Sequence, residues 1–177
     1  MKIKAYIIPV VFFVSNLLFS QTTGNGTIAI TLPLVTLLDI EPAGSIAMNF
    51  LAPSEAGLPL AAPAVNATKW INYTSAIASG GLTKRITASV NQIIPGISIR
   101  LQAATAAGSG GGTLGTVVPQ VTLSTTPVNI ISGIGGAFTG NGANNGHRLT
   151  ISFVVSNYAN LNTQTNTPVV ITYTITE

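Results

Sequence analysis

The chain has 177 residues, of which only 7 are Lys or Arg and 4 are Asp or Glu, and it contains no cysteine. Without cysteine the protein holds no disulfide, zinc finger, iron–sulfur cluster or cysteine nucleophile. The few cations are scattered along the sequence and form no basic stripe that would neutralise phosphates, which excludes a nucleic-acid partner.

The first residues have the order of a secretory signal peptide. Lys2 and Lys4 precede an apolar stretch over residues 5–19, and Ser20-Gln21 offers a cleavage point. We therefore predict a signal peptide over residues 1–20 and a protein that is secreted or held at the cell surface. The apolar stretch is too short for a stable membrane span, so no transmembrane span is expected after signal removal. A retained anchor is the competing interpretation.

Cleavage leaves residues 21–177, a length typical of one domain. This part keeps five basic residues against four acidic ones, so its surface must be built from Thr, Ser, Asn and Gln. A surface of that kind repels copies of itself only weakly. The expected partners are therefore the protein itself, as a homopolymer, or other cell-surface components.

From Thr27 onwards apolar residues alternate with polar ones, and clusters of Gly, Pro and Asn separate the alternating runs. The predicted strands are residues 27–32, 34–40, 45–51, 69–74, 84–92, 97–102, 117–125, 128–134, 147–156 and 169–176. Residues 52–67 are predicted to form a long connection and residues 108–112 a flexible loop. No window keeps a helical spacing between two caps.

This succession predicts an all-β fold, an antiparallel β-sandwich of about 8–10 strands, immunoglobulin-like or pilin-like. A β-barrel is the alternative, because alternation alone does not separate the two.

The first predicted strand also carries a hypothesis about assembly. In filaments built by strand complementation, an extended segment of one subunit completes the open sheet of the next. Ile28, Ile30 and Leu32 share one face of such a segment and are the candidate residues of a subunit-linking strand. Pairing of residues 27–32 within their own domain is the commoner arrangement and the competing prediction.

Trp70 and Tyr73 are candidates for a glycan-binding platform, since aromatic rings stack on sugars. A core tryptophan between two sheets is the alternative, and the more frequent arrangement.

The remaining polar residues predict no catalytic or metal site. His147 is the single histidine, and the nucleophile-elbow pattern G-x-S-x-G does not occur, so we interpret His147 as a residue between a loop and a strand. Asp39 and Glu41 stand two apart before Pro42, which is typical of a solvated strand end that resists edge-to-edge pairing.

Two glycine clusters resemble functional loops only in composition. Gly110, Gly112 and Gly115 satisfy G-x-G-x-x-G, but the residues that follow do not begin a helix, as dinucleotide binding requires. Residues 133–146 lack the lysine of a phosphate loop and the aspartates of a calcium repeat. They are predicted to be a mobile or hairpin-connecting segment.

Four passages carry a resemblance to known proteins: LDIEP at residues 38–42, KWINYTS at 69–75, IISGIG at 130–135 and ITYTIT at 171–176. They resemble uncharacterised secreted proteins of Bacteroidota, as the Ser20-Gln21 junction resembles export signals of those Gram-negative bacteria. The chain is also loosely similar to fimbrial, pilin-like subunits, which differ in often carrying a disulfide. The resemblance implies an exported β-sandwich and no known activity.

Together these features predict a non-catalytic extracellular structural or adhesive protein, a subunit of a surface filament, without cofactor or metal. The first alternative is a monomeric secreted carbohydrate-binding module that uses Trp70 and Tyr73. The second is an enzyme whose site is assembled only by the fold, around His147.

Overall fold

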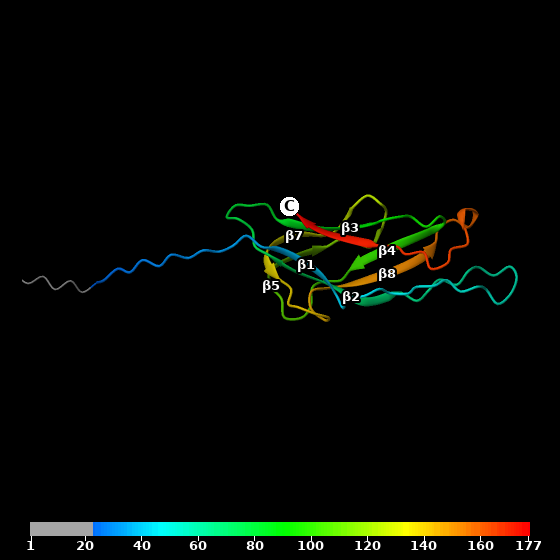
Figure 1. Ribbon diagram of the computed structural model, residues 1–177, viewed down its shortest axis with the longest axis horizontal. Helices are drawn as coiled ribbons and strands as arrows, with labels where there is room; N and C mark the ends of the chain where they lie inside the picture. The colour runs from blue at the N-terminus through cyan, green and yellow to red at the C-terminus, as the bar shows by residue number, and fades with distance from the viewer. Residues whose placement is uncertain (1–22) are drawn as a thin grey trace, which may run out of the picture. The chain divides into compact units, whose positions relative to one another are not determined.

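The computed structural model describes residues 23–177 (Figure 1). The predicted signal peptide, residues 1–20, lies outside the described residues. The chain divides into two units whose boundary falls between Leu32 and Pro33. The second unit, Pro33–Glu177, contains all the strands of the described residues.

Residues 23–177 form nine strands and one short 3₁₀ turn. The strands are β1 (Thr36–Glu41), β2 (Asn66–Ser75), β3 (Lys84–Val90), β4 (Ile97–Ala103), β5 (Gly111–Val117), β6 (Val121–Thr122), β7 (Val128–Phe138), β8 (His147–Val155) and β9 (Ile171–Thr176), and the turn η1 is Tyr158–Asn160. Every pairing between them is antiparallel. The predicted all-β, antiparallel fold is confirmed.

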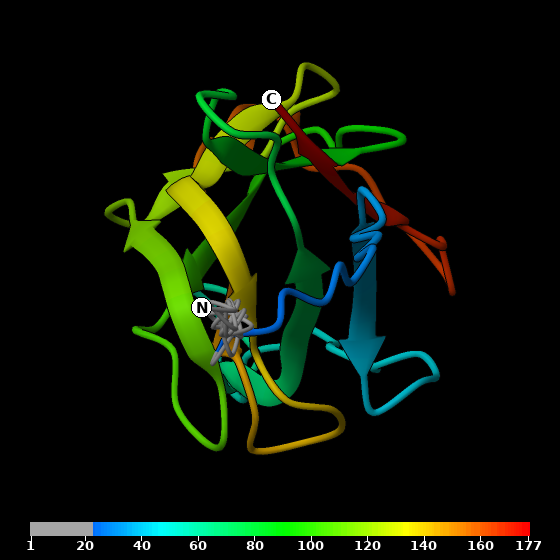
Figure 2. The same ribbon diagram turned by 90° about the vertical axis from the view of Figure 1, so that its left-hand side faces the viewer.

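The strands follow one open path, β6-β4-β8-β2-β7-β3-β9, with β1 paired to β2 and β5 paired to β7. β2 and β7 meet only where Thr74 and Ser75 pair with Phe138 and Ala137. This narrow contact divides the path into two layers of a sandwich, one with β1, β2, β8, β4 and β6 and one with β5, β7, β3 and β9. Figure 2 shows strands of both layers around a common interior.

Alternating side chains of both layers fill that interior, because successive residues of a strand point to opposite faces. The fully buried large apolar side chains are Ile71, Ile86, Leu101, Ile130, Ile131, Ile134 and Leu149. They come from five strands of the two layers and form one hydrophobic cluster. Burial of each such side chain contributes about 1.5–3 kcal/mol to folding relative to leaving it in water.

Two buried lysines form hydrogen bonds with the backbone at the two ends of β1. Lys69 on β2 donates from Nζ to the carbonyl oxygens of Pro42 (2.5 Å) and Gly44 (2.6 Å), just after β1 ends. Lys84 on β3 donates to the carbonyl oxygen of Val35, just before β1 begins. Both ammonium groups are satisfied by oxygens of neutral groups rather than by carboxylates.

Two predicted strands are wrong. Residues 27–32 were expected to be half buried in a strand, but they form no strand and their apolar side chains are exposed. Residues 45–51 pack Ile46 and Met48 against the core, yet pair only through a single bridge between Leu51 and Ala61. Alternation is thus present in both segments, but neither pairs with a strand of the described residues, which alternation alone does not reveal.

The glycine-rich segments contain more strand than predicted. β5 begins at Gly111, inside the expected loop, and β7 continues through its glycines to Phe138. A Cβ atom on Gly112 would overlap the backbone oxygen of Gly136, so glycine lets these two strands approach closely. Conversely, only Val121–Thr122 of the predicted strand 117–125 pairs as a separate strand.

Candidate functional site

Residues 27–34 carry a row of exposed apolar side chains. Ile28, Ile30 and Leu32 are 84%, 79% and 88% exposed, and Leu34 is 70% exposed. The four residues are spaced two apart, so an extended chain places them on one face. Because residues 23–35 form no strand, the row has the pattern of a β-strand without a strand beside it.

The composition of this segment favours an extended chain. Thr27, Ile28, Ile30 and Thr31 are β-branched, which restricts their side chains and favours strand geometry. Pro33 has no backbone N–H, so a ladder formed by this segment would end at that residue. No charged residue occurs between residues 21 and 38, so no charge opposes pairing with another strand.

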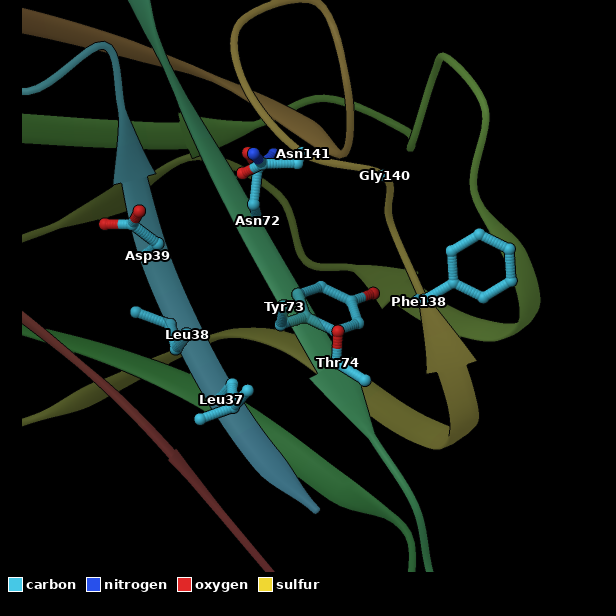
Figure 3. Close-up of a pocket in the computed structure, with 9 residues that line it drawn as sticks. All are labelled: Leu37, Leu38, Asp39, Asn72, Tyr73, Thr74, Phe138, Gly140 and Asn141. Carbon is cyan, nitrogen blue, oxygen red and sulfur yellow. The ribbon is translucent and has the colours of Figure 1, made fainter.

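A pocket of about 580 Å³ opens beside β1 and β2 (Figure 3). Leu37 and Phe138 supply apolar surface to it, and Asp39, Asn72 and Asn141 supply polar groups. In Figure 3 Asn72 and Asn141 lie together at one end, with Leu37 and Thr74 towards the other and the Phe138 ring at the side.

The polar groups of this pocket are largely engaged by the protein. Asp39 accepts a hydrogen bond from the backbone N–H of Ile40 (2.7 Å). Asn72 donates from Nδ2 to the carbonyl oxygen of Asn145 (2.6 Å), while its Oδ1 is buried without a hydrogen-bond partner. The pocket thus contains a single carboxylate and no paired acid and base.

His147 and Tyr73 form a buried pair inside the sandwich. Their rings stack with centroids 5.8 Å apart, and only 1% of His147 and 3% of Tyr73 is exposed. The Nδ1 of His147 donates to the carbonyl oxygen of Ala104 (2.8 Å), and its Nε2 lies 3.0 Å from the hydroxyl oxygen of Tyr73. The Tyr73 hydroxyl donates its one proton to the carbonyl oxygen of Leu114.

These contacts give the pair a role in packing. Burial lowers the pKa of His147 and favours the neutral ring, although hydrogen bonds to the backbone of Ala104 and Leu114 act in the opposite direction. Burial likewise raises the pKa of Tyr73 well above its ordinary value. Within residues 23–177, His147 makes no hydrogen bond to a serine hydroxyl or to a carboxylate. The two partners that a histidine has in a hydrolytic triad are therefore not among its hydrogen-bond partners.

Trp70 and Tyr73 do not form a shared surface. They are three residues apart on β2, so their side chains point to opposite faces of the strand. Tyr73 points to the interior, and Trp70 is half buried on the other side. A glycan platform made of both rings therefore receives no support from this arrangement.

Asp39 and Glu41 lie on the edge strand β1, where they pair with Asn72 and Trp70 of β2. In the part of the chain from residue 23 onwards, no three His, Asp or Glu side chains gather as metal ligands. The glycines of the G-x-G-x-x-G match fall in and beside strand β5, and Val121–Thr122 is the next element. The strand-to-helix context of a dinucleotide loop is absent at that point of the described chain.

Within residues 23–177, no helix has the length and apolar character of a membrane span. Comparison of the sequence and the structure with family models, curated proteins and solved structures gives no match. The candidate functional site therefore depends on the geometry of the chain itself. Among the exposed large apolar side chains of residues 23–177, those of Ile28, Ile30, Leu32 and Leu34 form a row with strand spacing that packing within one copy does not account for.

Proposed function

We propose that this protein is a non-catalytic extracellular structural or adhesive protein that serves as a subunit of a surface filament. The observation that carries the proposal is the row of Ile28, Ile30 and Leu32, which has strand spacing, lies outside any strand and is at least 79% exposed. In this function the row links one subunit to the next by adding a strand to its sheet.

The energetics favour a partner for this row. Burial of each of the three side chains contributes about 1.5–3 kcal/mol relative to leaving it in water. A chain that remains a monomer forgoes that contribution. It also exposes a strand-like apolar segment of the kind that promotes association. Assembly through the row would bury these side chains and would also remove the exposed apolar segment from water.

The composition supports the same function. The five basic and four acidic residues that remain after the predicted cleavage give the protein little long-range repulsion, which suits subunits packed closely in a polymer. The predicted signal peptide over residues 1–20 supplies the route out of the cytoplasm.

Immunogold electron microscopy of cells that produce the protein tests the function directly. An antibody raised against residues 33–177 is expected to label thin fibres along their length. Label spread evenly over the cell surface, or protein found only in the medium, would contradict the filament. Cells carrying Ile30→Asp provide the matched control, since they are expected to export the protein without forming fibres.

A further inference from the structure

Four strands of the sandwich have an edge that pairs with no other strand of the described chain: β1, β5, β6 and β9. An open edge presents free backbone N–H and C=O groups and is a template for pairing with another chain. Natural proteins protect such edges with charges, prolines, bulges or short strands. The four edges differ sharply in this respect.

Three of the edges are protected. β1 carries Asp39 and Glu41, and Pro42 follows it. β5 contains a register shift between Gly112 and Leu114, which interrupts its ladder. β6 is only two residues long. Each of these features is among those that discourage the addition of a strand.

β9 has the least protection, since the one charge next to it is Glu177, which follows the strand. Its sequence, ITYTIT, contains no charge, no proline and no glycine, and its register with β3 is continuous from Ile171 to Thr176. Its outward residues Thr172, Thr174 and Thr176 are exposed, while the alternate residues are half buried. Figure 2 shows β9 (dark red) on the same side of the folded unit as β1, in the other layer.

The register also shows which backbone groups are free. The carbonyl oxygen of Val170 accepts from the N–H of Asn91 on the β3 side (3.1 Å), so Val170 faces β3. In an antiparallel ladder this orientation alternates. Thr172 and Thr174 therefore also face β3, and Ile171, Tyr173 and Ile175 direct their N–H and C=O groups to the open edge.

A hollow of about 200 Å³ lies next to this edge. Apolar side chains that belong to or pack against the core line most of it, among them Ile40, Ile46, Val169, Ile171 and Tyr173, and Ser45 and Lys69 add polar groups. An apolar cavity of about 150 Å³ accommodates a benzene ring. The hollow thus has room for an aliphatic side chain that arrives with an added strand.

We propose that the open edge of β9 receives residues 27–32 of a second copy of this chain as an added β-strand, an inference that rests on the function proposed above. The two segments match in length, since both have six residues. Both segments lack charge, and both alternate a large residue (Ile, Leu or Tyr) with a threonine or an alanine. In this pairing Ile28, Ile30 and Leu32 cover the interior side, and Ala29 and Thr31 face outward beside the threonines of β9.

The partner is a second copy because the matching segment is part of this chain and joins no strand within one copy. Pro33 fits the same arrangement. It stands directly after the sixth residue of the segment and, having no N–H, ends the added ladder at that point.

Cysteine cross-linking tests the pairing, because the chain has no cysteine of its own. Two single variants of the full chain are mixed under mild oxidation: Ala29→Cys, with a mass tag, and either Thr172→Cys or Thr174→Cys. Residues directly opposite each other in paired strands have Cα atoms about 4.5–5.5 Å apart, which a disulfide spans. A tagged–untagged heterodimer is expected with one of the two β9 variants.

Matched controls place the acceptor cysteine on the protected edges, as Leu37→Cys on β1, Thr113→Cys on β5 or Thr122→Cys on β6. The β9 variant is expected to give several-fold more heterodimer than any of these. Equal or greater cross-linking to a protected edge would overturn the assignment to β9. The double variant Ala29→Cys/Thr174→Cys, or its Thr172→Cys counterpart, adds a second check. A disulfide formed within single chains at high dilution would show that the donor segment belongs to the same copy, and this result would also overturn the proposal.

Failure of this pairing is distinguishable from failure of the proposed function. Immunogold-labelled fibres with cross-links at another edge keep the filament and overturn β9 as the acceptor. Cross-links between Ala29→Cys and β9 without fibres keep the pairing and overturn the filament.

Discussion

The ammonium group of Lys84 lies 3.2 Å from the carbonyl oxygen of Val35, one residue before β1 begins. The same nitrogen donates to the carbonyl oxygen of Ala76 (3.2 Å) and to the hydroxyl of Thr36. A lysine has three donors, and these three oxygens satisfy all of them. Lys84 thereby fixes the point at which the chain enters the folded unit.

Replacement of Lys84 by methionine is expected to lower the free energy of unfolding by about 1–3 kcal/mol, because it removes the lysine donor from the carbonyl oxygens of Val35 and Ala76 and leaves Val35 only the N–H of Ala76. Urea unfolding followed by tryptophan fluorescence measures the change. Arg85→Met is the control, since Arg85 is exposed on the same strand and its loss should change stability by no more than about 0.5 kcal/mol. Equal effects of the two substitutions would contradict the role of Lys84.

The stability of the fold is expected to fall as pH decreases below 6.5. Burial holds the pKa of His147 below the value of 6.5 that an unfolded chain retains, so the unfolded state takes up the proton first. Proton uptake then favours unfolding, and the stabilisation present above pH 6.5 is lost as pH falls towards the folded pKa.

Urea unfolding at pH 7.5 and at about pH 5, still above the ordinary pKa of carboxyl groups, isolates this effect. The variant His147→Gln is expected to lose less stability between the two conditions than the wild type. An identical loss in both proteins would show that another group is responsible.

Gly146→Ala is expected to destabilise the fold by about 2 kcal/mol or more. Gly146 has φ of 76°, and a Cβ atom there would overlap the backbone oxygen of Ile71, which has no room to move within the paired strands. Gly136→Ala is the matched control, because a Cβ at Gly136 meets nothing within 4 Å and the residue is not in the left-handed region. Thermal unfolding of both variants compares them directly.

Ile30→Asp is expected to abolish self-association while changing the free energy of unfolding by no more than about 0.5 kcal/mol, because the side chain is exposed in the single copy. Thr31→Asp introduces the same charge on the opposite face of the segment and should leave association intact. Light scattering of concentrated protein after size-exclusion chromatography measures both. Association of Ile30→Asp at the wild-type level would argue against the row as a link.

Most strands could be predicted from the sequence because their alternation is backed by burial. In β3 the inward positions hold Lys84, Ile86, Ala88 and Val90, and in β9 they hold Ile171, Tyr173 and Ile175. The alternation in residues 27–32 is equally regular, yet these residues form no strand. The alternation of apolar and polar residues predicts which face of a segment is apolar. It does not predict whether the strand or sheet that buries this face belongs to the same copy of the chain.

The polar interior was harder to predict. Lys84 occupies an inward position of the alternation in β3, and that parity was a usable signal that its ammonium group would be buried. Nothing in the local sequence identifies its acceptors at Val35 and Ala76, because the fold brings them together. The same holds for Tyr73 and His147, which are 74 residues apart and meet only in the sandwich.

The pairing of β1 with β2 has a mechanical consequence for a fibre under tension. A pull on residues 27–32 enters the folded unit at Val35 and runs along β1, whose six residues pair with Trp70 to Ser75 of β2. The hydrogen bonds of this ladder lie across the direction of the pull, so they are loaded together rather than one after another. If the chain forms the fibre proposed above, the ammonium group of Lys84 adds resistance where the force arrives, and the β1–β2 ladder would be loaded in shear.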